Sequence, residues 1–227
     1  MEGSNINMPL PATKEKKPTA LSKNKKKERK KTVTVYPKTN TTVSEKHSTK
    51  EREKSAVTEN TNAMNVMAIQ ANAYATTNGY SVKYCFLIDM AIPSGRDRFF
   101  VYDFEKKSVV LSGLVAHGSC NETFLSHPRF SNQPKCGCSS LGKYKVGEFY
   151  RGKYGKSYRL YGLDKSNSNA YRRAVVIHGY GCVPDKEIYP MVLCNSEGCA
   201  MVSYNFFDKL SRIIANSDEP ILLWIYQ

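Results

Sequence analysis

The residues best suited to chemistry are a histidine at the end of an apolar run and a cysteine in a glycine-containing loop. His178 lies in the run "VVIHG", and Cys199 ends the segment "SEGC" 21 positions later. A thiol becomes a nucleophile when a nearby base takes its proton and hydrogen-bond donors stabilise the oxyanion formed after attack. Gly198 gives backbone N–H groups space to reach such an oxyanion, so the pattern fits nucleophilic catalysis.

Two other roles remain open for the cysteines of "CNSEGC". Cys136, Cys138, Cys194 and Cys199 supply four thiols for a zinc ion, although C-x-C with C-x4-C differs from the usual C-x2-C pairs. A disulfide such as Cys182 with Cys194 would staple a secreted domain without using Cys199. The chain has seven cysteines, so at least one thiol stays unpaired within a single chain.

The elements that must position these residues lie in residues 62–227, where apolar, β-branched and aromatic runs alternate with short breaks. This texture predicts a mainly β domain with two helices, one of them packed against a sheet or sandwich. Gly79 is placed to end the first helix, and Ser203 is placed to cap the second. The expected elements are a helix over 62–79, a strand over 84–92, hairpins over 99–115 and 144–163, a strand over 173–179, a helix over 203–216 and a strand over 220–227.

Residues 1–61 differ from the rest of the chain in charge and in aromatic content. They hold 15 Lys and Arg against 7 Asp and Glu, with one Tyr and no Phe or Trp, in a chain of net charge +14. Such a segment buries too little apolar surface to offset the entropy of ordering, so we expect a disordered basic arm. The arm is either a solvated linker or a binder of nucleic acid, anionic lipid or anionic polymer.

The sequence shows neither the apolar core of a signal peptide near its start nor a run long enough to span a bilayer. Taken alone, this predicts a soluble intracellular protein. A start that is trimmed or misassigned would give the same pattern.

A resemblance narrows the choice of chemistry. The segment "IHG" followed by "SEGC" resembles the His…Ser/Thr-x-Gly-Cys motif of the YkuD-type L,D-transpeptidases, which cross-link peptidoglycan. Residues 84–226 resemble more specifically the murein L,D-transpeptidase catalytic domain family. The segments that carry this resemblance, in the family's order, are "FLIDMAIPSGRDRFFVYD", "LVAHG", "RFSNQP", "SSLGKYKVGEFYRGKYGKSYRLYGLD", "NAYRRAVVIHG" and "SEGC". The resemblance implies a YkuD-like β-sandwich with two helices.

The resemblance implies that Cys199 is the nucleophile and that His178 is its base. Ser196 and Gly198 then shape the loop, with the N–H groups of Gly198 and Cys199 as oxyanion donors. The carbonyl of Gly179 would orient the imidazole as the third member of a triad. A thiol paired with histidine should also have the lowest pKa of the seven.

The resemblance also implies a substrate-binding surface. Arg159, in "YRLYG", is expected to meet a substrate carboxylate in a bidentate fork. Tyr161, His117 and Ser140 are further expected substrate-binding residues.

The implied reaction is acyl transfer on peptidoglycan stem peptides, giving 3-3 cross-links or, with water, an L,D-carboxypeptidase outcome. It needs no metal or cofactor, and it takes place in the periplasm or cell envelope, where the basic arm could bind an anionic polymer. Nucleic acid is not an expected partner, because the domain lacks a stacking-aromatic motif for bases. Asn195, Glu197 and Ala200 depart from the family's pattern, and they motivate the alternative of a non-catalytic peptidoglycan-binding domain with the same fold.

Overall fold

The computed structural model describes residues 63–227, and the predicted basic arm lies outside them. This part of the chain contains one helix over 63–78, a second helix α2 (Tyr204–Ala215), and nine strands. The strands, in chain order, are β1 (Tyr84–Asp89), β2 (Phe99–Asp103), β3 (Ser108–Gly113), β4 (Val115–Ala116), β5 (Gly142–Gly152), β6 (Gly155–Gly162), β7 (Val176–Gly179), β8 (Ala200–Val202) and β9 (Leu222–Tyr226).

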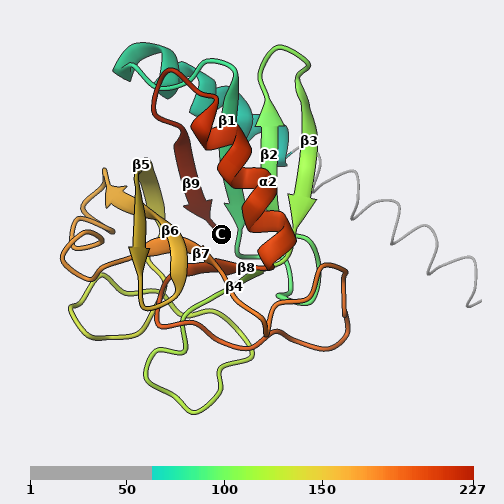
Figure 1. Cartoon of the computed structure of the whole chain (residues 1–227), viewed down its shortest axis with the longest axis vertical. Helices are drawn as coiled ribbons and strands as arrows, with labels where there is room; N and C mark the ends of the chain where they lie inside the picture. The colour runs from blue at the N-terminus through green and yellow to red at the C-terminus, as the bar shows by residue number, and fades with distance from the viewer. Residues whose placement is uncertain (1–62) are drawn as a thin grey trace, which may run out of the picture. The chain divides into compact units, whose positions relative to one another are not determined.

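All the strands of the described residues belong to one sheet, in the order β3-β2-β1-β9-β5-β6-β7-β8-β4 (Figure 1). The last strand of the chain, β9, lies between β1 and β5, parallel to β1 and antiparallel to β5. The pair β7 and β8 is also parallel. The other neighbouring pairs run antiparallel.

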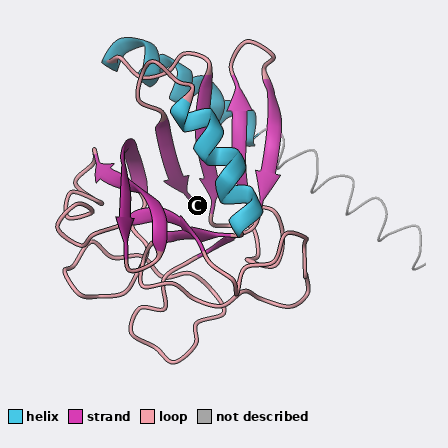
Figure 2. Cartoon of the chain, in the orientation of Figure 1, coloured by secondary structure: helices cyan, strands magenta, loops and turns pink. Residues whose placement is uncertain are grey.

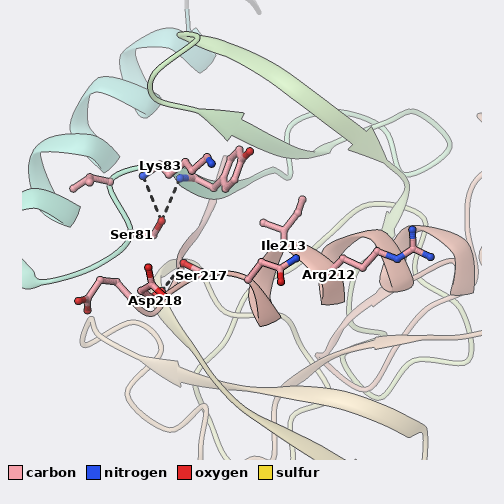
Figure 3. Close-up of a pocket in the computed structure, with 10 residues that line it drawn as sticks. Ser81, Lys83, Arg212, Ile213, Ser217 and Asp218 are labelled. Carbon is pink, nitrogen blue, oxygen red and sulfur yellow. Dashed lines mark hydrogen bonds between the residues drawn. The ribbon is translucent and has the colours of Figure 1, made fainter.

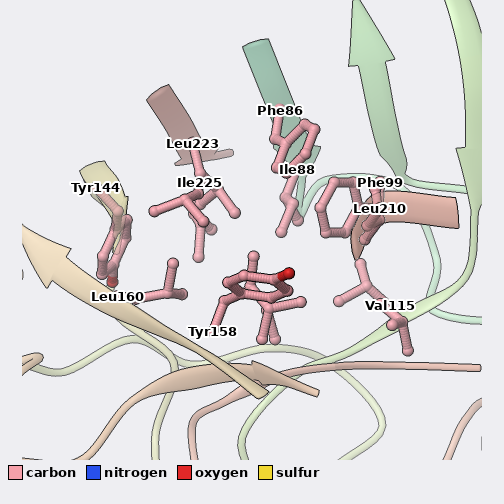
Figure 4. Packing of buried hydrophobic residues seen from close by; sticks show 14 of the residues in the cluster. Phe86, Ile88, Phe99, Val115, Tyr144, Tyr158, Leu160, Leu210, Leu223 and Ile225 are labelled. Carbon is pink, nitrogen blue, oxygen red and sulfur yellow. The ribbon is translucent and has the colours of Figure 1, made fainter. Parts of the chain in front are cut away.

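The sheet bends so that its two halves enclose one hydrophobic core. That core collects Phe86 and Ile88 from β1, Leu160 from β6, and Leu210 from α2 (Figure 4). Register shifts interrupt the ladders β2–β3 and β5–β6, and such bulges increase local bending. The expected mainly β fold with two helices is confirmed, with the two layers formed by a single curved sheet.

Strand β1 is apolar almost throughout because both of its faces are covered. Phe86 and Ile88 face the core, whereas Cys85 and Leu87 lie in a second cluster with Ala71 and Ala75 of the helix over 63–78. Burial on both faces removes the need for polar alternation along the strand. The helix over 63–78 therefore packs on the outer face of the sheet.

Local sequence signals predicted the ends of both helices well. The first helix ends before Gly79, which has φ +70°, and the Oγ of Ser203 accepts the N–H of Phe206 at the start of α2. Both predicted hairpins form, as β2–β3 and β5–β6. The second hairpin spans residues 142–162, close to the predicted 144–163, with a tight turn between Gly152 and Gly155.

The strand expected over 173–179 begins only at Val176. Ala174 has φ +54°, a left-handed conformation that cannot continue a strand. The side chain of Arg173, next to it, donates to Ser140 Oγ and to the carbonyl oxygens of Ser131 and Cys138. The chain therefore turns at Ala174 before it enters the sheet.

Two long connections gather at the end of the sheet where β4, β7 and β8 lie. They are residues 117–141 between β4 and β5, and residues 180–199 between β7 and β8, and Figure 2 shows most of each as loop. A parallel bridge between Gly118 and Ser196 joins the two connections. This junction surrounds the residues expected to do the chemistry.

Candidate active site

The register of β7 and β8 brings His178 and Cys199 into one cavity. In this parallel pair, Ile177 lies beside Ala200 and His178 lies beside Met201. Ile177 and Ala200 belong to the core, so His178 and Met201 face the opposite side of the sheet. Cys199 directly precedes β8 and lines the same cavity as His178.

The cavity has a volume of about 500 Å³ and is built mainly from three segments. The connection after β4 forms one wall, the tip of the β5–β6 hairpin forms another, and the residues before β8 form the floor. The lining residues are Ser119, Glu122, Thr123, Phe124, Lys153, Tyr154, His178, Tyr180, Cys194, Asn195, Ser196, Glu197, Cys199 and Met201.

The imidazole of His178 is held in the tautomer that a base requires. Its Nδ1 lies 3.2 Å from the carbonyl oxygen of Gly179. A carbonyl can only accept, so Nδ1 carries the proton and Nε2 keeps its lone pair. Burial lowers the pKa of His178 below its usual value, which keeps the ring neutral at neutral pH. The expected orienting carbonyl of Gly179 is therefore present.

The spacing of Ser196, Gly198 and Cys199 has a local structural cause. Ser196 Oγ donates to the carbonyl oxygen of Cys199 (2.8 Å) and accepts the N–H of Gly198 (3.1 Å). Gly198 has φ +104°, and a Cβ there would lie 2.5 Å from the carbonyl oxygen of Cys138. Serine closes the turn, and only glycine fits at the position before Cys199.

This turn also engages one of the two expected oxyanion donors. The N–H of Gly198 donates to Ser196 Oγ, so it is not free to donate to an oxyanion in this arrangement. The N–H of Cys199 remains the predicted donor.

The thiol of Cys199 is buried, with 7% of the residue exposed. Burial is the main effect that raises its pKa, and the charge of Glu197 raises it further. The backbone N–H of Val176 and the charge of Arg173 act in the opposite direction. In this arrangement desolvation outweighs the groups that favour a thiolate, which acts against the expectation that Cys199 has the lowest pKa of the seven cysteines.

Tyr154, at the tip of the β5–β6 hairpin, covers the histidine. Its ring stacks on that of His178 with centroids 4.4 Å apart and planes 15° apart. Its hydroxyl donates to Glu197 Oε2 at 3.1 Å. Sequence reasoning missed Tyr154. The available signal was its position in "GKYG", at the turn of a hairpin in which Ser157 pairs with His178.

Two of the expected substrate-binding residues lie outside the cavity on the same face of the sheet. Arg159 pairs with Val176, two residues before His178, and its Nε lies 3.0 Å from Glu148 Oε1. Tyr161 donates to the same carboxylate, and its ring stacks on Tyr171 with centroids 5.1 Å apart. Neither residue lines the cavity.

The other two expected substrate-binding residues are buried behind the cavity. Ser140 is 3% exposed, and its Oγ donates to the carbonyl of Ser131 and accepts from Arg173. His117 is 1% exposed, and both of its ring nitrogens have partners within the protein.

The cysteines divide between disulfides and free thiols. Cys182 pairs with Cys194, as the disulfide alternative expected, and Cys120 pairs with Cys138. Two of the four thiols of the zinc alternative are therefore engaged elsewhere. Cys85, Cys136 and Cys199 are free thiols. Among residues 63–227, no three His, Cys, Asp or Glu side chains gather as metal ligands would.

A second cavity of about 500 Å³ lies between the start of β1 and the C-terminal end of α2 (Figure 3). Ser81 Oγ accepts the N–H groups of Lys83 and Tyr84 at its edge. It contains none of the expected site residues. In the described part of the chain, no helix is long and apolar enough to cross a membrane.

Comparisons with solved structures return proteins of low identity. An L,D-transpeptidase from Xylanimonas cellulosilytica is 13% identical with a TM-score of 0.38, over 66% of this chain and 62% of that one. The helical cell shape determining protein Pgp2 from Campylobacter jejuni is 14% identical with a TM-score of 0.40, over 66% and 50%. An L,D-transpeptidase from Mycobacterium tuberculosis is 14% identical with a TM-score of 0.33, over 64% and 58%. This chain thus spans less than two thirds of each of these proteins.

The comparison with protein families is more decisive. Among curated proteins, none matches this sequence. The family described as the L,D-transpeptidase catalytic domain matches residues 53–226, which include both His178 and Cys199. Because this match covers most of the chain, the protein belongs to the L,D-transpeptidase catalytic domain family.

Proposed function

We propose that the protein is a cysteine-dependent L,D-transpeptidase that acts on peptidoglycan stem peptides, with Cys199 as nucleophile and His178 as base. The observation that carries this proposal is the shared cavity of the two side chains, with the Gly179 carbonyl at Nδ1 of His178. An imidazole in this tautomer can take a thiol proton at Nε2.

The reaction begins when His178 takes the proton of Cys199. The thiolate attacks the carbonyl carbon that precedes the terminal D-alanine of a donor stem peptide, and a C–S bond forms. The C–N bond then breaks, and D-alanine leaves as an amine with the proton from His178. An amine of a second stem peptide resolves the thioester into a 3-3 cross-link, and water resolves it into a shortened peptide.

Tyr154 lies where a donor peptide would approach His178. Its ring covers His178, and its hydroxyl bonds the residue two positions before Cys199. We therefore propose that the donor peptide displaces the hairpin tip (residues 152–155) when it enters. Arg159 and Tyr161, on the same face, would contact more distant parts of the substrate.

The site of action follows from the substrate. Peptidoglycan lies in the cell envelope, so we propose the periplasm or cell envelope as the place where the protein works. The binding of an anionic envelope polymer by the basic residues 1–61 remains a prediction from charge.

A non-catalytic peptidoglycan-binding domain is the second candidate. The burial of the Cys199 thiol and its raised pKa favour this alternative, since they lower the thiolate fraction at neutral pH. The two candidates differ in whether a covalent intermediate forms.

Intact-mass analysis of the protein after incubation with purified muropeptides tests the proposal. We expect an acyl adduct that is absent in Cys199→Ala and present in Cys136→Ala, which removes another free thiol. His178→Ala should lose most of the activity, and the double mutant should be no worse than Cys199→Ala, because the two residues act as a unit.

Three results would overturn the mechanism. An undiminished adduct in Cys199→Ala would assign the chemistry to another thiol. Full turnover in His178→Ala would remove this histidine from the base role. Binding of muropeptide by the protein without formation of an acyl adduct would favour the non-catalytic peptidoglycan-binding domain.

A further inference from the structure

A buried arginine lies behind the wall of the cavity. Arg98 is fully buried, and among residues 63–227 no carboxylate lies within salt-bridge distance of its guanidinium, although the charge of Asp89 acts on it from farther away. Its Nε and Nη2 donate to the carbonyl of Val115, and its Nη1 donates to the carbonyl of Ile92. Nη2 also lies 3.0 Å from Nδ1 of His117. Burial of the guanidinium charge carries a desolvation cost, which these hydrogen bonds offset.

The contact with Arg98 fixes the tautomer of His117. A guanidinium can only donate, so Nδ1 of His117 must accept and Nε2 must carry the proton. Burial, and after it the charge of Arg98, lower the pKa of His117 to about 4, so the ring is neutral at neutral pH. The exposed His127 is the other nearby group whose charge disfavours protonation.

The proton on Nε2 of His117 points to a junction with the loop that carries Cys199. Nε2 lies 3.0 Å from the carbonyl oxygen of Leu125 and 3.3 Å from Nδ2 of Asn195, and since both nitrogens carry protons, both donate to that carbonyl rather than to each other. The side chain of Asn195 bonds the same residue twice: Nδ2 donates to the Leu125 carbonyl (2.9 Å), and Oδ1 accepts the Leu125 N–H (2.6 Å). Leu125 is therefore clamped by one side chain from each connection.

The clamp lies directly beside the reacting residues. Asn195 precedes Ser196, whose hydroxyl holds the turn at Cys199. The N–H of Ser196 donates to the carbonyl of His117, and the N–H of Ser119 donates to the carbonyl of Ser196. Residues 119–124 form a wall of the cavity and end at Leu125.

We propose that His117, whose tautomer is set by Arg98, is a positioning residue, which through Leu125 and Asn195 holds the cavity wall against the loop of Cys199. This inference rests on the proposed function for its kinetic consequence. The arrangement predicts that the donor N–H of His117 matters more to the site than the aromatic ring does.

Two substitutions of His117 separate positioning from simple packing. The amide nitrogen of Gln can replace Nε2 and donate to Leu125, whereas the shorter Asn can accept from Arg98 but cannot reach Leu125. Both remove a buried ring, so both should lower Tm. We expect His117→Asn to lower kcat for acyl transfer by at least about 10-fold, and His117→Gln to retain it within about threefold.

A readout that does not depend on turnover is the reactivity of the Cys199 thiol. We expect His117→Asn to increase the rate of alkylation of Cys199 by iodoacetamide, measured by peptide mass spectrometry, and to speed exchange of the Leu125 amide. Asn195→Ala should give the same result if His117→Asn does not fold. Tyr144→Phe is the matched control, since it removes a buried hydroxyl whose bond to the Ser140 carbonyl lies outside the clamp.

The outcomes distinguish this inference from the proposed function. Equal effects of His117→Gln and His117→Asn on alkylation of Cys199 and on exchange of the Leu125 amide would overturn the positioning role. An unchanged alkylation rate of Cys199 in both His117→Asn and Asn195→Ala would overturn it as well. A wild-type protein that forms no acyl adduct, but in which the two His117 variants still differ in alkylation and exchange, would refute the proposed function and leave the clamp standing.

Discussion

Gly198 offers a sharp test of how the loop before Cys199 is built. Replacement by alanine forces a residue with a side chain to adopt φ +104°, at a cost of about 1–2 kcal/mol. The new Cβ would also lie 2.5 Å from the carbonyl oxygen of Cys138, so backbone must move. Overpacking of this kind adds about 1–3 kcal/mol. We expect Gly198→Ala to lose roughly 3 kcal/mol in total, a fall in Tm of about 6–12 °C in a domain of this size.

Gly79 provides the matched control for backbone strain alone. It has φ +70°, and no atom of the described residues lies within 4 Å of the position that a Cβ would take. Gly79→Ala should therefore lower Tm by only about 2–4 °C, the effect of about 1 kcal/mol. Thermal denaturation of the two variants gives the difference that is due to the contact with Cys138. Equal losses in Tm would refute the reasoning, because they would mean that the loop accepts the extra methyl group without cost. Muropeptide adduct formation should fall only in Gly198→Ala.

Two further predictions concern charge. Glu197→Gln should speed alkylation of Cys199 near neutral pH by a few fold, because the charge of Glu197 raises the pKa of the thiol and its removal increases the thiolate fraction; an unchanged rate would show that water screens the carboxylate. Acidification should lower the free energy of unfolding between pH 6.5, the usual pKa of histidine, and about 4, the pKa of His117 in the folded state. In this pH range His117 binds a proton in the unfolded chain but not in the folded protein. The free energy of unfolding therefore falls by at most about 1.4 kcal/mol per pH unit because of this histidine. Urea unfolding at several pH values measures the slope, which should be smaller in His117→Gln, and an equal slope would assign the acid sensitivity to other groups.

The elements that the sequence predicted well are those specified by neighbouring residues. The cap at Ser203, the helix end at Gly79 and the two hairpins depend on turn and capping chemistry within a few positions. The pairing of His178 with Cys199 came from a motif whose local geometry, a serine closing a turn at glycine, is visible in the structure.

The features that sequence reasoning missed depend on contacts between distant segments. Nothing local places β9 between β1 and β5, since strand order is settled by how the whole sheet closes around its core. The burial of His117 arises from Arg98 on one side and Leu125 on the other. From the sequence "AHG" alone, His117 could equally be a surface residue that binds substrate. The effect of burial on the pKa of the Cys199 thiol was missed for the same reason, because desolvation is a property of the assembled site.

The parallel register of β7 and β8 has a consequence for how this protein can change. Parallel neighbours cannot be joined by a tight turn, so the chain must leave the sheet after Gly179 and return at Ala200. The position of His178 is fixed by strand β7, whereas the connection between β7 and β8 supplies Tyr180, Asn195 and Glu197 to the cavity. Under the proposed function, the residues that contact substrate and the proposed base therefore lie in separable parts of the chain. Exchange of residues 180–198 between related proteins, with Cys182, Cys194, Ser196 and Gly198 kept, would then alter substrate preference while it leaves His178 and Cys199 in place.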